Sequence, residues 1–226
     1  MGVSHFFGTR TLLPIIIIAW LIALVPGVRY LLTYEYTPGK MEAAPVSWPS
    51  RVPFEGDASL PTLVVVLHPR CSCSKATLTE LEEAASGFNH PYNALMLIYQ
   101  PRGEKYNWQH VITYREAQQA LHAKVVMDDD GELAAGFGAL TSGEVLYYSA
   151  SDPLSTKKET PRRLLFSGGV TGSRGMVGEN AGVEALKTAV NGTPRYQRIG
   201  KTIVSTAVYG CGFATLGGSN KKQETP

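Results

Sequence analysis

A chain of 226 residues, 44% of them hydrophobic and 18% charged, is long enough for one good hydrophobic core, and a second full domain would be crowded. The formal net charge of +2 is nearly balanced, and there is no basic stripe interleaved with aromatic residues, so nucleic acid is not an expected partner. Three cysteines, only two of them close in sequence, do not fit a disulfide-stapled scaffold and favour reactive or metal-binding thiols.

The N-terminal region contains an uncharged apolar run from Leu12 to Val25. A membrane-spanning helix needs about 20 apolar residues, and Thr11 together with residues 26–28 extends the run toward that length. A signal peptide would end in a small-residue cleavage pattern, whereas bulky residues follow here. A retained anchor is therefore favoured over a signal peptide or a buried core helix.

The charges beside this run suggest its orientation. Arg10 and the terminal amine precede it, while Arg29 and Lys40 follow, which leaves a small positive-inside margin. We expect a cytoplasmic N-terminus over 1–10 and a transmembrane anchor over 11–28. The chain would then be a single-pass protein of the inner (plasma) membrane with its C-terminal domain extracytoplasmic, in the periplasm.

A proline-rich linker is expected next, over 29–60. Prolines at 38, 45, 49 and 53 alternate with small and polar residues, a composition that neither buries much surface nor sustains a helix. We expect this stretch to be a tether between the anchor and a folded domain over 61–190.

The first half of that domain alternates predicted strands with predicted helices. A β-branched run over 62–67 has the composition of a strand buried on both faces. Helical spacing of apolar residues follows, with Ser74 as the expected N-cap and Gly87 just past the end. Further predicted elements are a strand over 94–99, a helix over 113–122 and a strand over 124–127. This order predicts a parallel sheet with helices on its faces.

The second half of the domain predicts an antiparallel hairpin and a closing helix. Aspartates 128–130 precede a short helix over 132–137, and we interpret them as a solvated turn with helix-start charges. Strands are expected over 144–148 and 163–166, and Asn180 is a candidate cap for a helix through Val190. Residues 191–226 form a glycine-rich, weakly patterned C-terminal extension.

A strand that ends at a cysteine motif, opens a helix and leads to a terminal hairpin and helix resembles the thioredoxin superfamily. The segment Val126-Met-Asp-Asp-Asp-Gly-Glu-Leu-Ala-Ala-Gly-Phe-Gly-Ala139 is similar to membrane-anchored thioredoxins and peroxiredoxins. His68-Pro-Arg-Cys71-Ser-Cys73 and the loop Ser167-Gly-Gly-Val-Thr-Gly-Ser-Arg-Gly175 add a similarity to bacterial RedB-like membrane proteins. The resemblance implies an α/β fold, a thioredoxin-like three-layer sandwich with a central mixed sheet and helices on both faces, plus the N-terminal transmembrane helix.

Two features depart from the thioredoxin pattern. The motif is Cys-X-Cys instead of Cys-X-X-Cys, so the two-cysteine mechanism transfers by analogy. The place of the family's cis-proline is taken by Thr141-Ser142-Gly143. The resemblance makes Thr141 and Ser142 the expected substrate-facing loop, with room beside them for a metal.

Cys71 and Cys73 are the candidate catalytic residues. A thiolate is the reactive form of cysteine, and a helix N-terminus lowers a thiol's pKa. His68 and Arg70 are close enough in sequence to stabilise a thiolate further. A disulfide within Cys-X-Cys closes a small strained ring and would be easily reduced, as in an oxidant or isomerase.

Metal binding by the same thiols is the alternative. Soft thiolates favour copper(I), zinc or iron–sulfur clusters, and Cys71, Cys73, His68 and Cys211 form a possible ligand set. Cys211 is otherwise a resolving or mixed-disulfide thiol, or an inert one. Arg174, in the glycine-rich loop, could order a carboxylate or face the cysteines.

The sequence thus predicts a membrane-anchored extracytoplasmic thiol–disulfide oxidoreductase-like protein that needs no cofactor and acts on a protein thiol or disulfide partner. The alternatives are a thiolate carrier or assembly factor for copper or another thiophilic metal, and a non-catalytic thioredoxin-like interaction module.

Overall fold

A computed structural model describes residues 9–53, 56–101, 112–151, 162–192 and 203–213. The chain divides into two compact units, Met1–Thr37 and Pro38–Pro226. The expected cytoplasmic segment 1–10 lies almost entirely outside the described residues.

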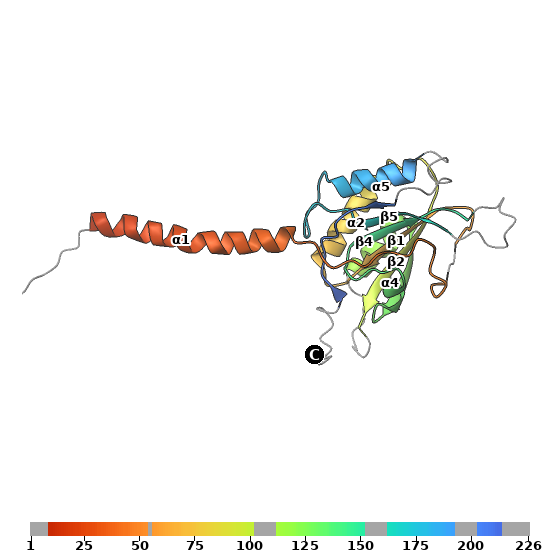
Figure 1. The fold of residues 1–226 in the computed structure, drawn as a ribbon, viewed down its shortest axis with the longest axis horizontal. Helices are drawn as coiled ribbons and strands as arrows, with labels where there is room; N and C mark the ends of the chain where they lie inside the picture. Colours follow the sequence, from red (N-terminus) through yellow and green to blue (C-terminus); the bar gives the residue numbers. More distant parts are fainter. Residues whose placement is uncertain (1–8, 54–55, 102–111, 152–161, 193–202, 214–226) are drawn as a thin grey trace, which may run out of the picture. The chain divides into compact units, whose positions relative to one another are not determined.

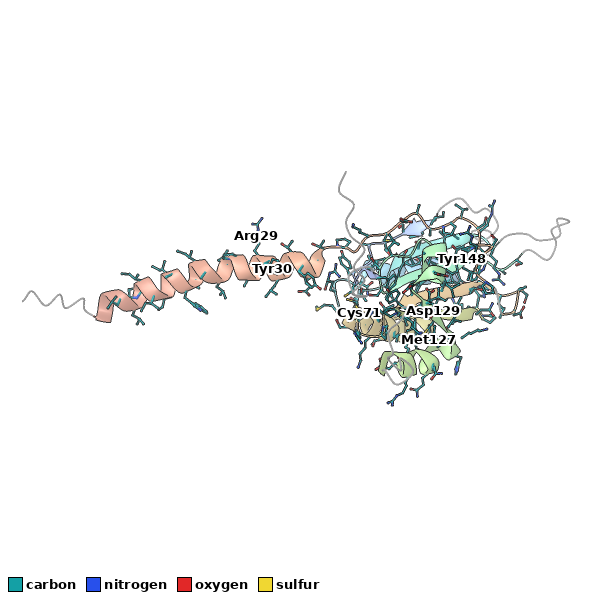
Figure 2. The ribbon with its side chains drawn as sticks, turned by 90° about the horizontal axis from the view of Figure 1, so that it is seen from below. Arg29, Tyr30, Cys71, Met127, Asp129 and Tyr148 are labelled. Carbon is teal, nitrogen blue, oxygen red and sulfur yellow. The ribbon has the colours of Figure 1, made fainter. Side chains whose placement is uncertain are left out.

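In the part of the first unit that the structure describes, the chain forms one long helix, α1 (Thr9–Tyr36). Its side chains from Leu12 to Tyr36 are exposed, apart from the half-buried Glu35, and Figure 2 labels Arg29 and Tyr30 among the exposed ones. Leu12–Tyr36, with mean hydropathy 2.3, is long and apolar enough to cross a membrane. The helix continues past Val28, the expected end of the anchor, because Arg29–Tyr36 contains no further helix breaker.

The second unit is built on one mixed sheet (Figure 1). Among the described residues the sheet has six strands in the order β3-β2-β1-β4-β5-β6. Strands β1, β2 and β3 are parallel, β4 is antiparallel to both β1 and β5, and β6 is parallel to β5. The bounds are β1 Thr62–Leu67, β2 Asn93–Gln100, β3 Lys124–Asp129, β4 Glu144–Tyr148, β5 Leu164–Gly169 and β6 Val204–Ser205.

Helices cover both faces of the sheet (Figure 1). On one face α2 (Ser72–Ala85), α3 (Ile112–Gln119) and α5 (Ala181–Asn191) pack on the odd-numbered side chains of β1. On the other face α4 (Glu132–Gly136) packs on Val64 and Val66. The α/β, thioredoxin-like three-layer architecture predicted from the sequence is therefore confirmed, since β1-α2-β2 followed by the β4-β5 hairpin and α5 is the thioredoxin arrangement.

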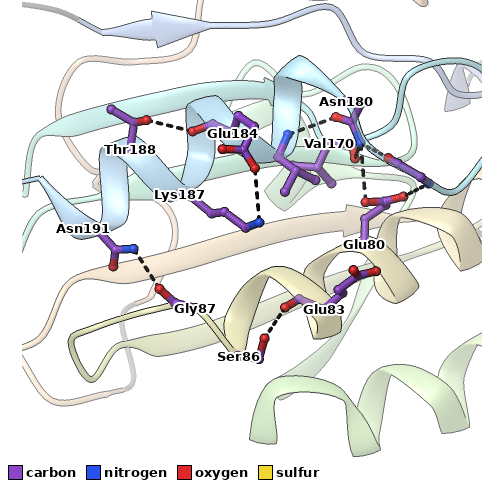
Figure 3. Close-up of polar contacts among 12 residues, drawn as sticks. Glu80, Glu83, Ser86, Gly87, Val170, Asn180, Glu184, Lys187, Thr188 and Asn191 are labelled. Carbon is purple, nitrogen blue, oxygen red and sulfur yellow. Dashed lines mark hydrogen bonds and ion pairs between the residues drawn. The ribbon is translucent and has the colours of Figure 1, made fainter.

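The closing helix is capped and docked as its sequence predicts (Figure 3). Asn180 adopts an extended conformation and its Oδ1 accepts a hydrogen bond from the Val183 amide at 3.0 Å. Glu80 of α2 accepts hydrogen bonds from the Gly178 amide and from Asn180 Nδ2. Asn191 Nδ2 donates to the Gly87 carbonyl at 2.8 Å, so the start of α5 is bound to α2 and its end to the turn that follows α2.

The proline-rich segment is not simply a tether. Residues after Pro38 lie on the domain, with the Gly39 amide donating to the Val208 carbonyl at 2.8 Å and the Trp48 amide to the Arg162 carbonyl at 3.0 Å. Val52 is buried, and the Trp48 ring lies 5.0 Å from that of Phe137. The expectation of little burial is wrong because proline restricts a segment to extended conformations, which still allow aromatic and aliphatic side chains to pack.

Asp128 also differs from its predicted environment. Its side chain is buried rather than solvated, and its carboxylate accepts hydrogen bonds from the amides of Leu133 at 2.7 Å and Ala134 at 2.8 Å. The residue therefore serves the first turn of α4, since those amides have no partner within the helix.

Candidate functional site

Cys71 and Cys73 lie where β1 leads into α2. Cys71 is the N-cap, with extended backbone angles, and Cys73 lies in the first helical turn. The N-cap prediction for Ser74 is wrong by three residues: Ser74 lies inside the helix, and its Oγ accepts a hydrogen bond from the His68 amide at 2.8 Å. Figure 2 labels Cys71 beside the start of this helix. Both thiols are buried, Cys71 at 4% exposure and Cys73 at 2%.

The third cysteine joins this pair. Cys211 Sγ lies 3.1 Å from Cys71 Sγ, and the three sulfur atoms of Cys71, Cys73 and Cys211 all lie within 4.8 Å of one another. The C-terminal extension therefore supplies part of the site.

The loop before β4 holds Cys211 in place. The Ser142 hydroxyl donates to Cys71 Sγ at 3.2 Å and accepts from the Cys211 amide at 3.1 Å. Thr141 is fully buried, and its hydroxyl donates to the Lys40 carbonyl at 2.7 Å. Of the two residues expected in the substrate-facing loop, Ser142 thus contacts the thiols, whereas Thr141 binds the proline-rich segment at Lys40.

The surroundings shift the pKa values of the three thiols in different directions. Hydrogen bonds from Cys211 and Cys73, and a weaker one from Ser142, lower the pKa of Cys71 despite its burial. The same contacts raise the pKa of Cys73, because its proton is shared toward the neighbouring sulfurs and burial penalises a second charge. The pKa of Cys211 is also raised, chiefly by its contact with Cys71. The geometry therefore favours one thiolate, on Cys71, held by two thiols.

His68 lies under the motif as a neutral ring. Its Nδ1 accepts a hydrogen bond from the Arg70 amide at 3.1 Å, and its ring stacks on Tyr99 with centroids 5.5 Å apart. Burial lowers the pKa of His68 to about 4. At neutral pH the His68 ring is thus uncharged. His68 is not part of the group of ligand atoms that lie within 4.8 Å of one another, which consists of the three cysteine sulfurs. The side chain of Arg70 is exposed.

The glycine-rich loop contributes Arg174. A Cβ at Gly175 would lie 3.2 Å from Ser72 Oγ, so this loop adjoins the start of α2. The Arg174 guanidinium donates a hydrogen bond to the Gly210 carbonyl. Arg174 therefore binds the segment that carries Cys211, and no local pattern around Arg174 predicts this contact.

Comparisons with known proteins give remote structural likenesses only. No protein-family model matches the chain, and no curated protein does. An uncharacterized conserved protein from Geobacillus kaustophilus has 14% identity and a TM-score of 0.48, over 77% of this chain and 92% of its own. A hypothetical protein from Sinorhizobium meliloti 1021 has 17% identity and a TM-score of 0.46, over 76% and 92%.

A secreted Mycobacterium tuberculosis disulfide oxidoreductase homologous to E. coli DsbE has 17% identity and a TM-score of 0.33, over 46% of this chain and 75% of its own. The class is defined by the strand order and the cysteine site of this chain, independently of these remote likenesses: it is an α/β protein of thioredoxin-like fold with a three-cysteine cluster, suited to thiol redox chemistry or to binding a metal.

Proposed function

We propose that this chain is a membrane-anchored thiol–disulfide oxidoreductase-like protein that reacts through Cys71. The observation that carries the proposal is the buried cluster of three thiols at the start of α2, with Cys71 the one favoured as thiolate. Cys73, the sequence-predicted partner, lies in the same cluster. Arg70, exposed beside it, would meet the incoming protein, and His68 would support the turn.

The partner is a protein thiol or disulfide, and no bound cofactor is needed for the exchange. A thiolate attacks a disulfide sulfur directly, so the cluster holds everything required for the first step. The loop containing Thr141 and Ser142 is the surface that we expect to face the partner.

We place the reaction outside the cytoplasm, in the periplasm, with α1 as a single-pass anchor in the inner membrane. Arg10, before α1, supports this orientation, whereas Arg29 and Lys40, after the apolar run, oppose it, so the positive-inside margin is thin. An oxidising compartment is also where protein disulfides form and persist. Membership of the RedB-like group is part of this proposal and rests on the motifs around Cys71 and in the glycine-rich loop.

A thiophilic metal is the second candidate for the same residues. Three sulfurs within 4.8 Å of one another match a trigonal thiolate site, which suits copper(I) because soft ligands select soft ions. Zinc needs a fourth ligand, and His68 lies outside the sulfur cluster. The geometry thus supports copper(I) above zinc within this alternative.

One experiment separates the two functions. The full chain is purified in detergent under reducing, anaerobic conditions, its metal content is measured, and its thiols are titrated against a glutathione redox series. The oxidoreductase proposal expects a metal-free protein in which two thiols titrate together at one potential, and a Cys71→Ser variant that does not. Stoichiometric copper that is lost in Cys73→Ser would overturn it, and a Cys71→Ser variant unchanged in both assays would leave an interaction module.

A further inference from the structure

The C-terminal segment Gly210–Phe213 lies along the loop Leu140–Ser142 as an added antiparallel strand would. Thr141 and Gly212 form an antiparallel bridge. The Ser142 amide donates to the Cys211 carbonyl at 3.0 Å, and the Phe213 amide donates to the Leu140 carbonyl at 3.2 Å. Main-chain pairing of this kind is how an exposed edge recognises an extended peptide, whatever the peptide's sequence.

The pairing register brings one particular side chain to the reactive sulfur. With Cys211 opposite Ser142, its thiol lies 3.1 Å from Cys71 Sγ. The neighbouring Phe213 ring stacks on Tyr99 with centroids 5.0 Å apart, which anchors the far end of the segment. The segment therefore presents a cysteine to Cys71 as a bound protein substrate would.

The fit is close, and it depends on glycine. A Cβ on Gly210 would lie 1.8 Å from the Ser142 carbonyl oxygen, a contact that no side chain can make. Upstream, a Cβ on Gly169 would lie 2.5 Å from the Ala207 carbonyl oxygen, and Val208 is completely buried. The Arg174 guanidinium donates a hydrogen bond to the Gly210 carbonyl. The segment thus packs closely against the domain, with no space for larger residues at these glycines.

In this arrangement a partner protein cannot reach Cys71. The sulfur's residue is only 4% exposed, and the edge that would hold a partner peptide is already paired. The segment Gly210–Phe213 and a partner peptide therefore cannot occupy this edge at the same time, and the segment would displace the partner when it binds again.

Resting on the function proposed above, we propose that Gly210–Phe213 is an internal counterpart of the substrate and that Cys211, not Cys73, resolves the mixed disulfide formed at Cys71. The matching partner is an extended protein segment whose cysteine follows a glycine, because the Ser142 carbonyl leaves no space for a side chain there.

The exchange balances in two steps. The Cys71 thiolate attacks a partner disulfide, a Cys71–partner disulfide forms, and the partner's other sulfur leaves as a thiolate. Cys211, after losing its proton to solvent, then attacks Cys71 Sγ, the Cys71–Cys211 disulfide forms, and the partner's second sulfur leaves. The partner gains two electrons, and its two thiolates take up two protons from solvent. The Cys71 thiolate and the Cys211 thiol lose the two electrons, and the single Cys211 proton goes to solvent. A Cys71–Cys73 disulfide would instead close the small strained ring of Cys-X-Cys.

Trapping tests the assignment. The reduced full chain in detergent is mixed with oxidised glutathione, quenched with acid and analysed by intact mass and peptide mapping. We expect the wild-type chain and Cys73→Ser to lose glutathione and form Cys71–Cys211, whereas Cys211→Ser retains a glutathione adduct on Cys71. An adduct that persists in Cys73→Ser and clears in Cys211→Ser would overturn the proposal. Absence of any reaction at Cys71 in all three proteins would instead refute the proposed function itself.

A second variant tests docking while leaving all three cysteines in place. Gly210→Ala should slow clearance of the adduct by about tenfold or more, while Ser205→Ala, at an exposed position in β6, should leave it unchanged. A peptide with the sequence acetyl-Tyr-Gly-Cys-Gly-Phe-amide is activated as its thionitrobenzoate disulfide. It should react with Cys211→Ser faster than an analogue in which valine replaces the glycine before the cysteine. Unchanged clearance in Gly210→Ala, or equal rates for the peptides, would contradict the docking model.

Discussion

Replacing Glu144 by glutamine tests how burial controls the stability of this domain. Glu144 is fully buried at the start of β4, and neither carboxylate oxygen has a hydrogen-bond partner among the described residues. Burial raises the pKa of Glu144 from 4.5 to about 8, and the Leu140 backbone opposes the rise in part.

The sign of the pH dependence follows from proton binding. Between pH 4.5 and about 8 the folded chain keeps the Glu144 proton and the unfolded chain releases it, so stability falls as the pH rises through this window. At about 1.4 kcal/mol per pH unit, the loss approaches an upper limit of about 5 kcal/mol above pH 8. Glu144→Gln removes this dependence because an amide does not ionise.

The measurement is urea unfolding of the full chain in detergent at pH 4.5 and pH 8.5, with Glu82→Gln as an exposed carboxylate control. We expect Glu144→Gln to match the wild-type midpoint at pH 4.5 and to exceed it at pH 8.5, and Glu82→Gln to change neither. Equal midpoints for Glu144→Gln and the wild-type chain at pH 8.5 would refute the argument, since the carboxylate would then ionise in the folded state without cost.

Three further outcomes follow from the structure. Because burial lowers the pKa of His68 to about 4 from 6.5, stability should rise with pH across that window, and His68→Gln should flatten the acid side of a urea-midpoint profile. Gly143→Ala should lower the free energy of unfolding by about 1–3 kcal/mol, since its φ is +86° and a Cβ would lie 2.8 Å from Thr77 Oγ1; an unchanged denaturation curve would contradict this strain. Trp48→Ala should lower the free energy of unfolding by about 3 kcal/mol. An unchanged free energy of unfolding would indicate that the proline-rich segment acts purely as a tether.

Local patterns in the sequence predicted most of the elements. The strand over 62–67 is confirmed without change. A short apolar run rich in β-branched residues is typical of a strand in a sheet that is covered on both faces. The capping role of Asn180 is confirmed because cap preference depends on the residues of a single turn. The antiparallel pairing of β4 and β5, which two short apolar runs joined by a polar loop predict, is confirmed too.

Errors arose where a residue's neighbours come from elsewhere in the chain. Asp128 looked like part of a solvated turn because its sequence neighbours are charged, yet folding buries it against α4. Trp48 and Val52 lie in a proline-rich stretch whose composition says nothing about the hydrophobic face of the sheet that receives them. In both cases the deciding contacts are absent from the local pattern.

The sequence by itself determined the thioredoxin-like order of elements, the long apolar helix and the place of Cys71 and Cys73 at a helix start, since all three depend on periodicity and composition over short windows. The tertiary structure decided that Cys211 completes the cluster. That contact joins positions far apart in the chain through the pairing of Gly210–Phe213 with Leu140–Ser142. Main-chain hydrogen bonds set this register, and because they are common to all residue types they leave almost no mark in the sequence beyond the glycines that make the close approach possible.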